Sequence, residues 1–502
     1  MRSRRLQASA IGLGGLGGTV AVGAATVWNP WATVGAMGVV FAVTLGVFFA
    51  RRLPRFFLGL LGLLLIGYAF FGRSFAYLGA PPVFVGEMAL AVGLLAVLVS
   101  GGLSIPFRSP LAWLLLAFGA WGAVRTVPYI SVYHTDAIRD AAMWGYGTFA
   151  ILVATFLPRT GWLSRIPRCY HRMMPWFVLW VPVGWLFNHY LGARMPVLPG
   201  TDGVLLFTFK SGDAAVHLAG VATFLVVGLQ HFDKPSPRRG RTHASEWIVW
   251  SLWLVGFMLV AATNRGGALA SIVALFTVAV LRPAAARRKI PVVAVLAGAM
   301  ILLGSVANTA SLNIMDRDRE MSPQQVLTNL KSIVSGGGGE ALEGSRRWRL
   351  AWWTRIEQYT LFGDFFWTGK GFGVNLADDD GFQVTRDHSL RSPHNAHLML
   401  LARTGVPGEI LWLTLQGAFG LALLDAYRRA RRERRERVAQ LSLWILAYWI
   451  AFLVNASFDV YLEGPQGDIW FWSVFGVGIV ITQMWRDEAK RIALVPHVGE
   501  RA

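Results

Sequence analysis

The stretch RSPHNAHLML at residues 391–400 contains side chains that can bind an anion and move a proton. Ser392 is a good N-cap and Pro393 a good first helical residue, so a short helix is predicted to begin here. His394 and Asn395 would then lie in its first turn, where exposed N–H groups attract anions and keep an imidazole neutral. We therefore predict that His394 is a catalytic base and that Asn395 binds substrate.

Two cations elsewhere in the chain are suited to phosphate groups. Arg265 lies in TNRGGALAS, in a turn so short that two apolar segments must reverse around it. Its planar, permanently charged guanidinium suits bidentate contact with a phosphate, and the alternative is an anchor among lipid headgroups. Lys210, in FTFKSGDAAVHLA, directly precedes another apolar segment and has the same two interpretations. We predict that Arg265 is a catalytic cation and that Lys210 binds substrate.

Metal-binding patterns in the chain are weak. His394 and His397 are three residues apart and no carboxylate-rich partner follows them, which disfavours a zinc site. The acidic run at 378–380 is more typical of a solvated turn than of a site for a divalent ion. Cys169 is the only cysteine and falls in a predicted cytoplasmic loop, which excludes a disulfide framework and a cysteine-based metal site. We expect no metal and no cofactor.

These residues must be positioned by membrane helices. Of the 502 residues, 54% are hydrophobic and only 15% are charged, a composition too apolar for a soluble globular protein. Roughly fourteen apolar runs have the length of about 17 to 20 residues that a helix needs to cross a bilayer. Because barrel strands would alternate instead, we predict an all-α, polytopic transmembrane bundle. The runs fall near 10–27, 31–50, 53–71, 83–100, 108–124, 140–157, 173–190, 213–230, 246–263, 266–282, 290–307, 407–425, 439–457 and 468–485.

The distribution of Lys and Arg predicts the orientation of this bundle. With the N-terminus inside, the predicted cytoplasmic segments contain thirty Lys and Arg, whereas the short outer connections contain six. The positive-inside rule therefore places both termini in the cytoplasm, and Arg265 and Lys210 at the outer face. The same distribution explains the net charge of +19 without nucleic acid. The basic run at 428–437 is interpreted as a contact with anionic membrane lipids.

One outer connection, residues 308–395, is far longer than the others. Within it, residues 340–361 have an amphipathic pattern of Trp and Arg that predicts a helix lying at the headgroup level. The half-helix that follows should end near Gly405, because Pro407 begins the next span. We therefore divide the chain into four regions. They are 1–307 with eleven spans, 308–406 as the extracytoplasmic loop, 407–485 with three spans, and 486–502 as a cytoplasmic tail.

Three patterns resemble the O-antigen ligase and polymerase superfamily of bacterial membrane glycosyltransferases. They are TNRGGALAS, FTFKSGDAAVHLA and the closing stretch of the loop, from GSRRWRLAWW through GKGFG to SPHNAHLMLLARTGVPGEILW. The resemblance implies a bundle in the bacterial inner membrane with a charged reaction centre at its outer face. It also implies a donor whose glycan is linked to a polyprenyl diphosphate, usually undecaprenyl diphosphate, and an acceptor hydroxyl on a glycan, a lipid or a protein.

The resemblance also assigns roles to single residues. Arg265 and Lys210 would grip the donor diphosphate, and His394 would activate the acceptor. Arg346 or Arg347 matches an arginine that the family has near its loop helix. The family often has another arginine shortly before the segment of Lys210, where this chain reads GTDGVLLFTFK. The remaining outer candidates for that substrate contact are Arg194 and Arg73.

Fixed Arg and Lys can stabilise a departing diphosphate without a metal, and we expect direct attack with inversion at the anomeric carbon. A ligase is the leading interpretation, and a polymerase of lipid-linked polysaccharide repeat units is the closest alternative. A solute transporter is the rival class. Transport usually places ionisable groups near the bilayer midplane, whereas here the charged candidates cluster at the outer face and the midspan positions are almost entirely apolar.

Overall fold

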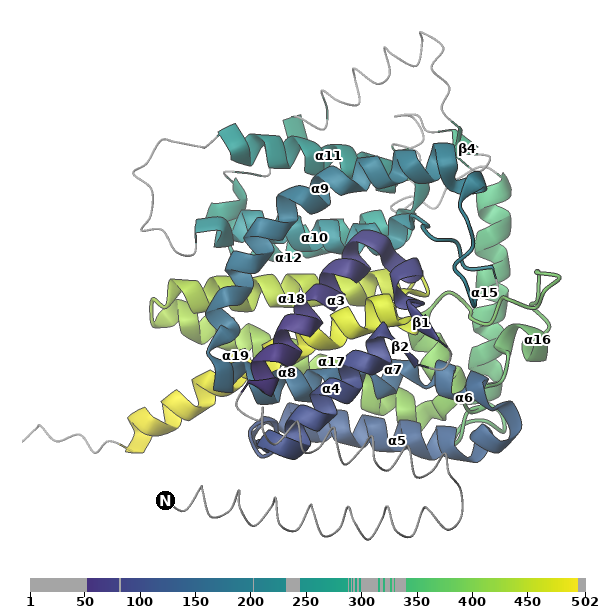
Figure 1. Ribbon diagram of the computed structural model, residues 1–502, viewed down its shortest axis with the longest axis horizontal. Helices are drawn as coiled ribbons and strands as arrows, with labels where there is room; N and C mark the ends of the chain where they lie inside the picture. Colours follow the sequence, from purple (N-terminus) through teal and green to yellow (C-terminus); the bar gives the residue numbers. More distant parts are fainter. Residues whose placement is uncertain are drawn as a thin grey trace, which may run out of the picture.

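The computed structural model describes residues 52–80, 83–201, 203–231, 244–287 and 340–494, with scattered positions between 289 and 329. Helices fill these ranges, as Figure 1 shows. The predicted runs at 10–27, 31–50 and 290–307 lie outside the described ranges. The long helices are α3 (Leu53–Ala76), α4 (Val85–Ser100), α5 (Pro110–Tyr133), α8 (Gly147–Thr160), α9 (Ile166–Leu191), α10 (Ser211–Val227), α11 (Ala244–Thr263), α12 (Arg265–Leu281), α15 (Glu340–Leu361), α17 (Ala396–Arg432), α18 (Glu436–Ala456) and α19 (Pro465–Leu494).

Short elements connect the long helices. The only strands in the described ranges form two-residue hairpins, so the predicted all-α class is confirmed. The short helices are α6 (Thr135–Asp140), α7 (Ala142–Gly145) and α16 (Leu376–Asp380), and the 3-10 turns are η1 (Pro106–Arg108), η2 (Trp162–Arg165), η3 (Gly192–Arg194), η4 (Leu229–His231) and η5 (Tyr461–Glu463). The antiparallel hairpins pair β1 (Gly79–Ala80) with β2 (Val83–Phe84), and β3 (Met315–Asp316) with β4 (Arg319–Glu320).

Six helices in the described ranges are both long and apolar enough to cross a membrane. They are α3, α5, α11, α17, α18 and α19. Helices α4, α10 and α12 are apolar too, but they have only 16 or 17 residues. Helices able to span a membrane are therefore present, as predicted. The described part of the chain supports six spans by these criteria, and the predicted number of about fourteen is not shown.

The helices lie side by side, and their connections gather at two ends of the bundle (Figure 1). At one end, Arg159 of α8 donates to the Ser100 carbonyl at 2.9 Å and Arg282 pairs with Glu436. At the other end, Lys210 pairs with Asp459. Connections predicted to share a side of the membrane thus share an end of the structure.

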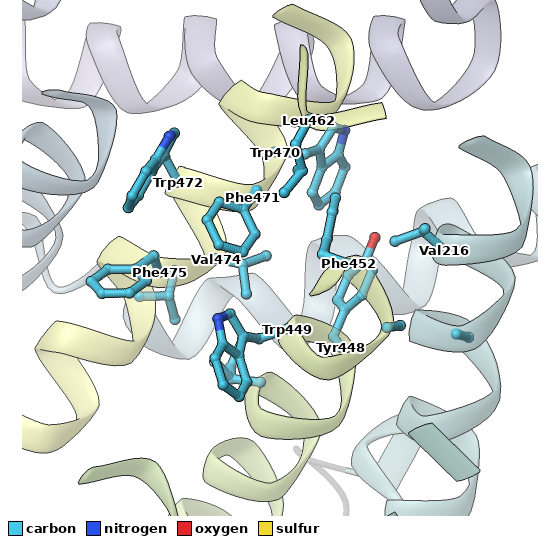
Figure 2. Packing of buried hydrophobic residues seen from close by; sticks show 14 of the residues in the cluster. Val216, Tyr448, Trp449, Phe452, Leu462, Trp470, Phe471, Trp472, Val474 and Phe475 are labelled. Atoms are coloured by element: carbon cyan, nitrogen blue, oxygen red, sulfur yellow. The ribbon is translucent and has the colours of Figure 1, made fainter. Parts of the chain in front are cut away.

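Helices α10 and α19 form the centre of the bundle. Every residue of α10 from Gly212 to Val227 is buried, because this helix is apolar on all sides. The rings of α18 and α19 pack together beside it (Figure 2). Phe419 of α17 stacks on Phe475 of α19 with 3.9 Å between ring centroids. Both central helices begin at the end of the bundle that contains Lys210, so the core fixes the positions of those two starting points.

One polar group in this core was not predicted from the sequence. His217 of α10 is buried and hydrogen-bonded through Nδ1 to the Tyr448 hydroxyl at 2.5 Å, and through Nε2 to the Tyr461 hydroxyl at 2.8 Å. The expectation of almost entirely apolar midspan positions therefore has an exception at His217. Because both ring nitrogens have partners, the imidazole links α10 to α18 and η5.

Helix α15 occupies the predicted amphipathic segment, with the same limits. It runs crosswise to α9, α10 and α18 at one end of the bundle (Figure 1). Its apolar side is buried through Trp352 and Ile356, and Trp352 stacks on Phe382 with 5.4 Å between ring centroids. The helix thus covers the ends of the membrane helices, as an interfacial helix should.

The predicted half-helix exists, but its start was wrong. Asn395 is the N-cap of α17 and its side-chain oxygen accepts the N–H groups of His397 and Leu398 at 3.1 and 3.2 Å. Asn and Ser are similarly good N-caps, and here the Ser392 hydroxyl is held elsewhere by Glu463. His394 therefore precedes the helix and does not lie in its first turn.

The half-helix ends at the predicted place. Helix α17 is broken at Gly405, whose φ of 69° is favourable for glycine. The break leaves backbone groups without helical partners. The GKGFG turn supplies new ones, since the N–H of Lys370 donates to the Ala402 carbonyl at 2.7 Å and that of Gly371 to the Arg403 carbonyl at 3.0 Å. This turn and the half-helix therefore form one folding unit.

A buried ion network anchors this unit. Arg403 is 1% exposed, and its guanidinium lies 2.9 Å from the Asp140 carboxylate and donates to the Gly371 carbonyl at 3.2 Å. Arg391 reaches the same carboxylate at 3.0 Å. Burial by itself would raise the pKa of Asp140. The two guanidinium groups outweigh burial and hold this pKa below its ordinary value. The sequence indicated none of these pairings.

We expect Arg403→Met to lower the free energy of unfolding by about 3 kcal/mol, because it leaves a buried carboxylate with one partner fewer. Thermal unfolding in detergent measures the effect. Arg429→Met is the matched control, since Arg429 forms an exposed pair with Asp425 at 2.9 Å and should cost about 0.5 kcal/mol or less. Equal shifts for the two variants would show that the network does not hold the loop.

Candidate active site

The predicted residues converge on the segment 457–464, SFDVYLEG, between α18 and α19. Asp459 in this segment forms an ion pair with Lys210. The other Asp459 carboxylate oxygen accepts a hydrogen bond from the Asn264 side chain at 3.4 Å. Asn264 is the N-cap of α12, and Arg265 is the first residue of that helix. One carboxylate therefore joins the starts of α10 and α12.

The Asp459 carboxylate occupies a place built for an anion. Lys210 is the N-cap of α10, and a Cβ added to Gly212 in the first turn would overlap the carboxylate. The carboxylate thus lies against the N-terminal turn of α10, where the dipole favours negative charge. Lys210 and the N-cap of α12 complete the surroundings. A phosphate oxygen has the same charge and the same preferences as this carboxylate.

Lys210 is shared between two acids, because its amine also lies 3.3 Å from Asp213. Burial lowers the pKa of Lys210, but the Asp213 and Asp459 carboxylates outweigh burial and raise the pKa above its ordinary value. The amine therefore carries a full positive charge at neutral pH. In this structure its charge is compensated by the protein's own carboxylates.

His394 lies beside this cluster in an unusual conformation. Its φ is 56°, which is uncommon for a residue with a side chain and is often found at functional sites. Burial, together with the positive charges of Arg349 and Lys210, lowers the pKa of His394 to about 4, although the Asp459 carboxylate opposes the change. The imidazole is therefore neutral near pH 7 and able to accept a proton.

Two hydrogen bonds hold the peptide group between Pro393 and His394. The Ser392 hydroxyl accepts from the His394 N–H at 3.2 Å and donates to the Glu463 carboxylate at 2.5 Å. The Trp353 indole of α15 donates to the Pro393 carbonyl at 2.9 Å. Burial raises the pKa of Glu463 to about 7, with the Ser392 hydrogen bond opposing it. The segment 457–464 thus holds the histidine loop at one end and Lys210 at the other.

Helix α15 reaches the site through Arg349, which the sequence did not single out. Its guanidinium donates to the Phe458 carbonyl at 3.2 Å. Arg346 and Arg347 lie about one turn earlier and are exposed. Their predicted substrate contacts stay predictions, as does that of Asn395, whose oxygen caps α17.

The predicted substrate contacts of Arg73 and Arg194 stay predictions. Arg73 is exposed at the end of α3 and donates to the Tyr77 hydroxyl at 3.3 Å. Arg194 is exposed in η3. The structure therefore places Lys210 and Asn264, the residue before Arg265, at the Asp459 carboxylate, and brings His394 within range of its charge.

The residues considered for metals have other partners. In the acidic run, Asp379 lies 2.5 Å from the Lys370 amine, and Asp380 pairs with the same amine. Asp378 accepts from His388 at 2.7 Å. His397 accepts the Trp412 indole N–H at 2.9 Å. The acidic run is therefore part of the short helix α16 and is ion-paired, where the sequence favoured a solvated turn.

The residues that sequence reasoning missed are mainly acids in one short connection. Asp459 and Glu463 both lie in segment 457–464, on the side where charged residues were predicted to be rare. Counting outer carboxylates as well as outer cations would have drawn attention to this segment. Their partners lie far away in sequence and could not have been identified in this way.

Comparison with known protein families finds one match, which covers part of this region. Residues 250–413 match the O-Antigen ligase family. The matched range includes Arg265, α15, the GKGFG turn, His394 and the break at Gly405. It ends before segment 457–464 and begins after Lys210. No curated protein matches the chain.

The low pKa of His394 predicts a pH-dependent stability. Because this pKa is about 4 in the folded chain and about 6.5 when unfolded, the unfolded state binds the proton more readily. The contribution of His394 is therefore fully present above about pH 6.5 and is lost as the pH falls toward 4. Between about pH 7 and pH 5 the protein should lose more stability than the His394→Gln variant, as measured by thermal unfolding.

His388→Gln is the matched control, since His388 lies in the same loop and is exposed. This variant should keep the pH dependence of the unaltered protein. An identical loss of stability in the protein and in His394→Gln would contradict the low pKa.

Proposed function

We propose that this membrane protein, whose residues 250–413 form an O-antigen ligase family domain, is a glycosyltransferase. It would move a glycan from a polyprenyl diphosphate donor, such as undecaprenyl diphosphate, to an acceptor hydroxyl. The reaction would take place at the outer face of the bacterial cytoplasmic membrane, with both termini in the cytoplasm. The proposal rests on one observation, the neutral His394 beside an anion position framed by Lys210 and the starts of α10 and α12.

The anion position suits the leaving group of this reaction. Breaking the glycosyl–oxygen bond leaves negative charge on the diphosphate, and fixed positive groups lower the barrier by stabilising that charge as it develops. Lys210 is charged and held in place, and Arg265 begins α12 beside the same carboxylate. These groups would bind the donor diphosphate and stabilise its departure.

His394 suits the acceptor side. As the acceptor oxygen forms its bond to the anomeric carbon, the hydroxyl proton passes to the neutral imidazole, and the bond to the diphosphate breaks. Direct attack inverts the anomeric carbon. A positioned base typically contributes about 10² to 10⁴-fold in rate, and the clamp formed by Ser392 and Trp353 supplies the positioning.

Asp459 acquires a role in this scheme as an internal anion. Its carboxylate holds Lys210 and Asn264 in place before the donor arrives. A bound diphosphate would take over Lys210 from the carboxylate, so the two anions compete for one cation. This competition keeps the site ordered when empty and weakens the hold on the diphosphate product.

We expect His394→Ala and Arg265→Ala each to abolish transfer while the protein still inserts into the membrane, with a loss of at least about 10²-fold for the histidine. Transfer from undecaprenyl diphosphate-linked glycan by purified protein is the measurement. His388→Ala and Arg287→Ala are controls, because both side chains are exposed and outside the site. Normal surface glycan in cells that carry either site variant would contradict the assignment of His394 and Arg265 to the active site.

The competition between Asp459 and the donor makes a separate prediction. Asp459→Asn removes a negative charge beside Lys210, so inorganic pyrophosphate should bind about tenfold more tightly, or about 1.4 kcal/mol. Calorimetric titration of protein in detergent measures this, and Asp378→Asn in the outer loop is the control. Weaker binding by a folded Asp459→Asn variant would show that the carboxylate only supports the structure.

A polymerase of lipid-linked repeat units would use the same residues and the same chemistry. The species that accumulate in a deletion strain separate the two activities. Loss of a ligase leaves long polyprenyl-linked chains, whereas loss of a polymerase leaves single repeat units.

A further inference from the structure

Two large aromatic side chains directly after α15 are exposed. Phe362 is 86% exposed, more than any other large apolar side chain in the described part of the chain, and Trp367 is 70% exposed. Leu361, the last residue of α15, is 40% exposed. Clustered apolar exposure of this kind usually marks a surface that another molecule covers. We name residues 361–367 the aromatic turn.

The backbone of the aromatic turn is fixed to the end of α15. The Phe365 N–H donates to the Tyr359 carbonyl at 3.1 Å, and the Gly369 N–H donates to the Phe365 carbonyl at 2.9 Å. The Phe365 ring packs edge-on against the Tyr359 ring, with 5.7 Å between their centroids. The two exposed rings are therefore held on a folded turn.

The aromatic turn is also joined to the break in α17. The Phe366 carbonyl accepts the Val406 N–H at 2.8 Å, and a Cβ on Gly405 would meet the same oxygen at 2.6 Å. Helix α17 is one of the candidate membrane spans. Its exposed side chains after the break include Ile410 and Leu413, at 57% and 56%. Because a helix rises about 1.5 Å per residue, Ile410 lies only about 6 Å along the axis from Val406.

Helix α5, a second candidate span, adjoins the same region. The chain that follows the aromatic turn packs on this helix, since a Cβ on Gly371 would overlap the Tyr129 ring. Two neighbouring side chains of α5, Val124 and Val127, are 56% and 63% exposed. In a membrane-spanning helix, exposed apolar side chains of this kind face lipid. The aromatic turn is therefore continuous with two helices that present apolar side chains to the bilayer.

A bilayer and a glycan are the two kinds of molecule that could cover these rings. Arg349, which reaches the Phe458 carbonyl in the candidate site, precedes Phe362 by thirteen residues. This separation corresponds to about 20 Å along a helix. The rings are thus far from the site along α15, but close to the level at which α17 begins to expose apolar side chains. Their position favours the bilayer.

We propose that the aromatic turn inserts Phe362 and Trp367 among the lipid headgroups at this end of the bundle. Aromatic side chains are suited to this layer, where amphipathic segments bury their apolar side. Asp364 lies between the two rings in sequence and is exposed. A carboxylate is costly in hydrocarbon, so the turn stays within the headgroup layer. The anchor holds α15 at a fixed depth above the membrane helices, and this role is independent of the transfer reaction.

A single fluorescent label tests the anchor. Cys169 is the only cysteine, so Trp367→Cys in a Cys169→Ser background carries one bimane label. The full-length protein is placed in vesicles of phosphatidylethanolamine and phosphatidylglycerol, with or without brominated phosphatidylcholine. Arg386→Cys is the matched control, because Arg386 is exposed in the same loop. Leu413→Cys gives the signal of a side chain that faces lipid.

Brominated lipid should quench the label at position 367 at least about twofold more than the label at 386, because only the former lies at the boundary of the acyl chains. Iodide in the aqueous phase should show the opposite order. Phe362→Ser should weaken the quenching by lipid at 367, since it removes the second ring of the anchor. If Trp367→Cys does not fold, a label on Phe362→Cys should give the same pattern.

Two results would overturn the proposal. Quenching by iodide alone, equal at positions 367 and 386, would show that the aromatic turn faces water and that its rings are free for a glycan. Equal quenching by brominated lipid at both positions would show that the whole loop touches the bilayer, with no special role for the turn.

Discussion

A helix cannot be interrupted within a membrane protein unless its exposed backbone groups find new partners, because lipid offers none. Two apolar helices in this structure are interrupted at glycines with positive φ, α17 at Gly405 and α3 at Gly72. At the first break, the GKGFG turn pairs with the end of the half-helix. At the second break, the Trp180 indole donates to the carbonyl of Phe70, which lies two residues before Gly72. The half-helix that follows His394 ends at the first break, and Thr208, two residues before Lys210, lies beside the second.

The second organising element is the carboxylate of Asp459. Four parts of the chain contact its segment, namely the start of α10, the start of α12, α15 and the loop before α17. Tyr461 in the same segment is hydrogen-bonded to His217 in the core. This end of the bundle is therefore tied to the interior of the protein, and the candidate catalytic residues are placed by a connection of eight residues.

The charged groups at this end of the bundle serve two purposes that differ in burial. The network of Asp140, Arg391 and Arg403 is enclosed and has many partners, which suits a fixed support. The side chain of Lys210, which pairs with Asp459, is 38% exposed. A cation that is paired with a carboxylate but remains exposed can exchange that carboxylate for another anion. A fully enclosed cation cannot do so without unfolding its surroundings.

Much of this protein was determined by local sequence pattern. Apolar runs defined the membrane helices, the Trp and Arg pattern gave the limits of α15, and Gly405 with Pro407 marked the end of the half-helix. His394, Arg265 and Lys210 became candidates because ionisable groups are rare and costly near a membrane. These features depend on residues close together in the chain, so periodicity and residue type were sufficient.

Only the tertiary structure decided which groups meet. Lys210 and Asp459 are 249 positions apart, and Ser392 and Glu463 are 71 apart. The start of α17 was misplaced for the same reason, because the distant Glu463 engages Ser392 and leaves Asn395 to cap the helix. A local pattern can show that a side chain is able to cap a helix or bind an anion. Which partner it takes depends on packing between distant segments, and that packing is a property of the whole fold.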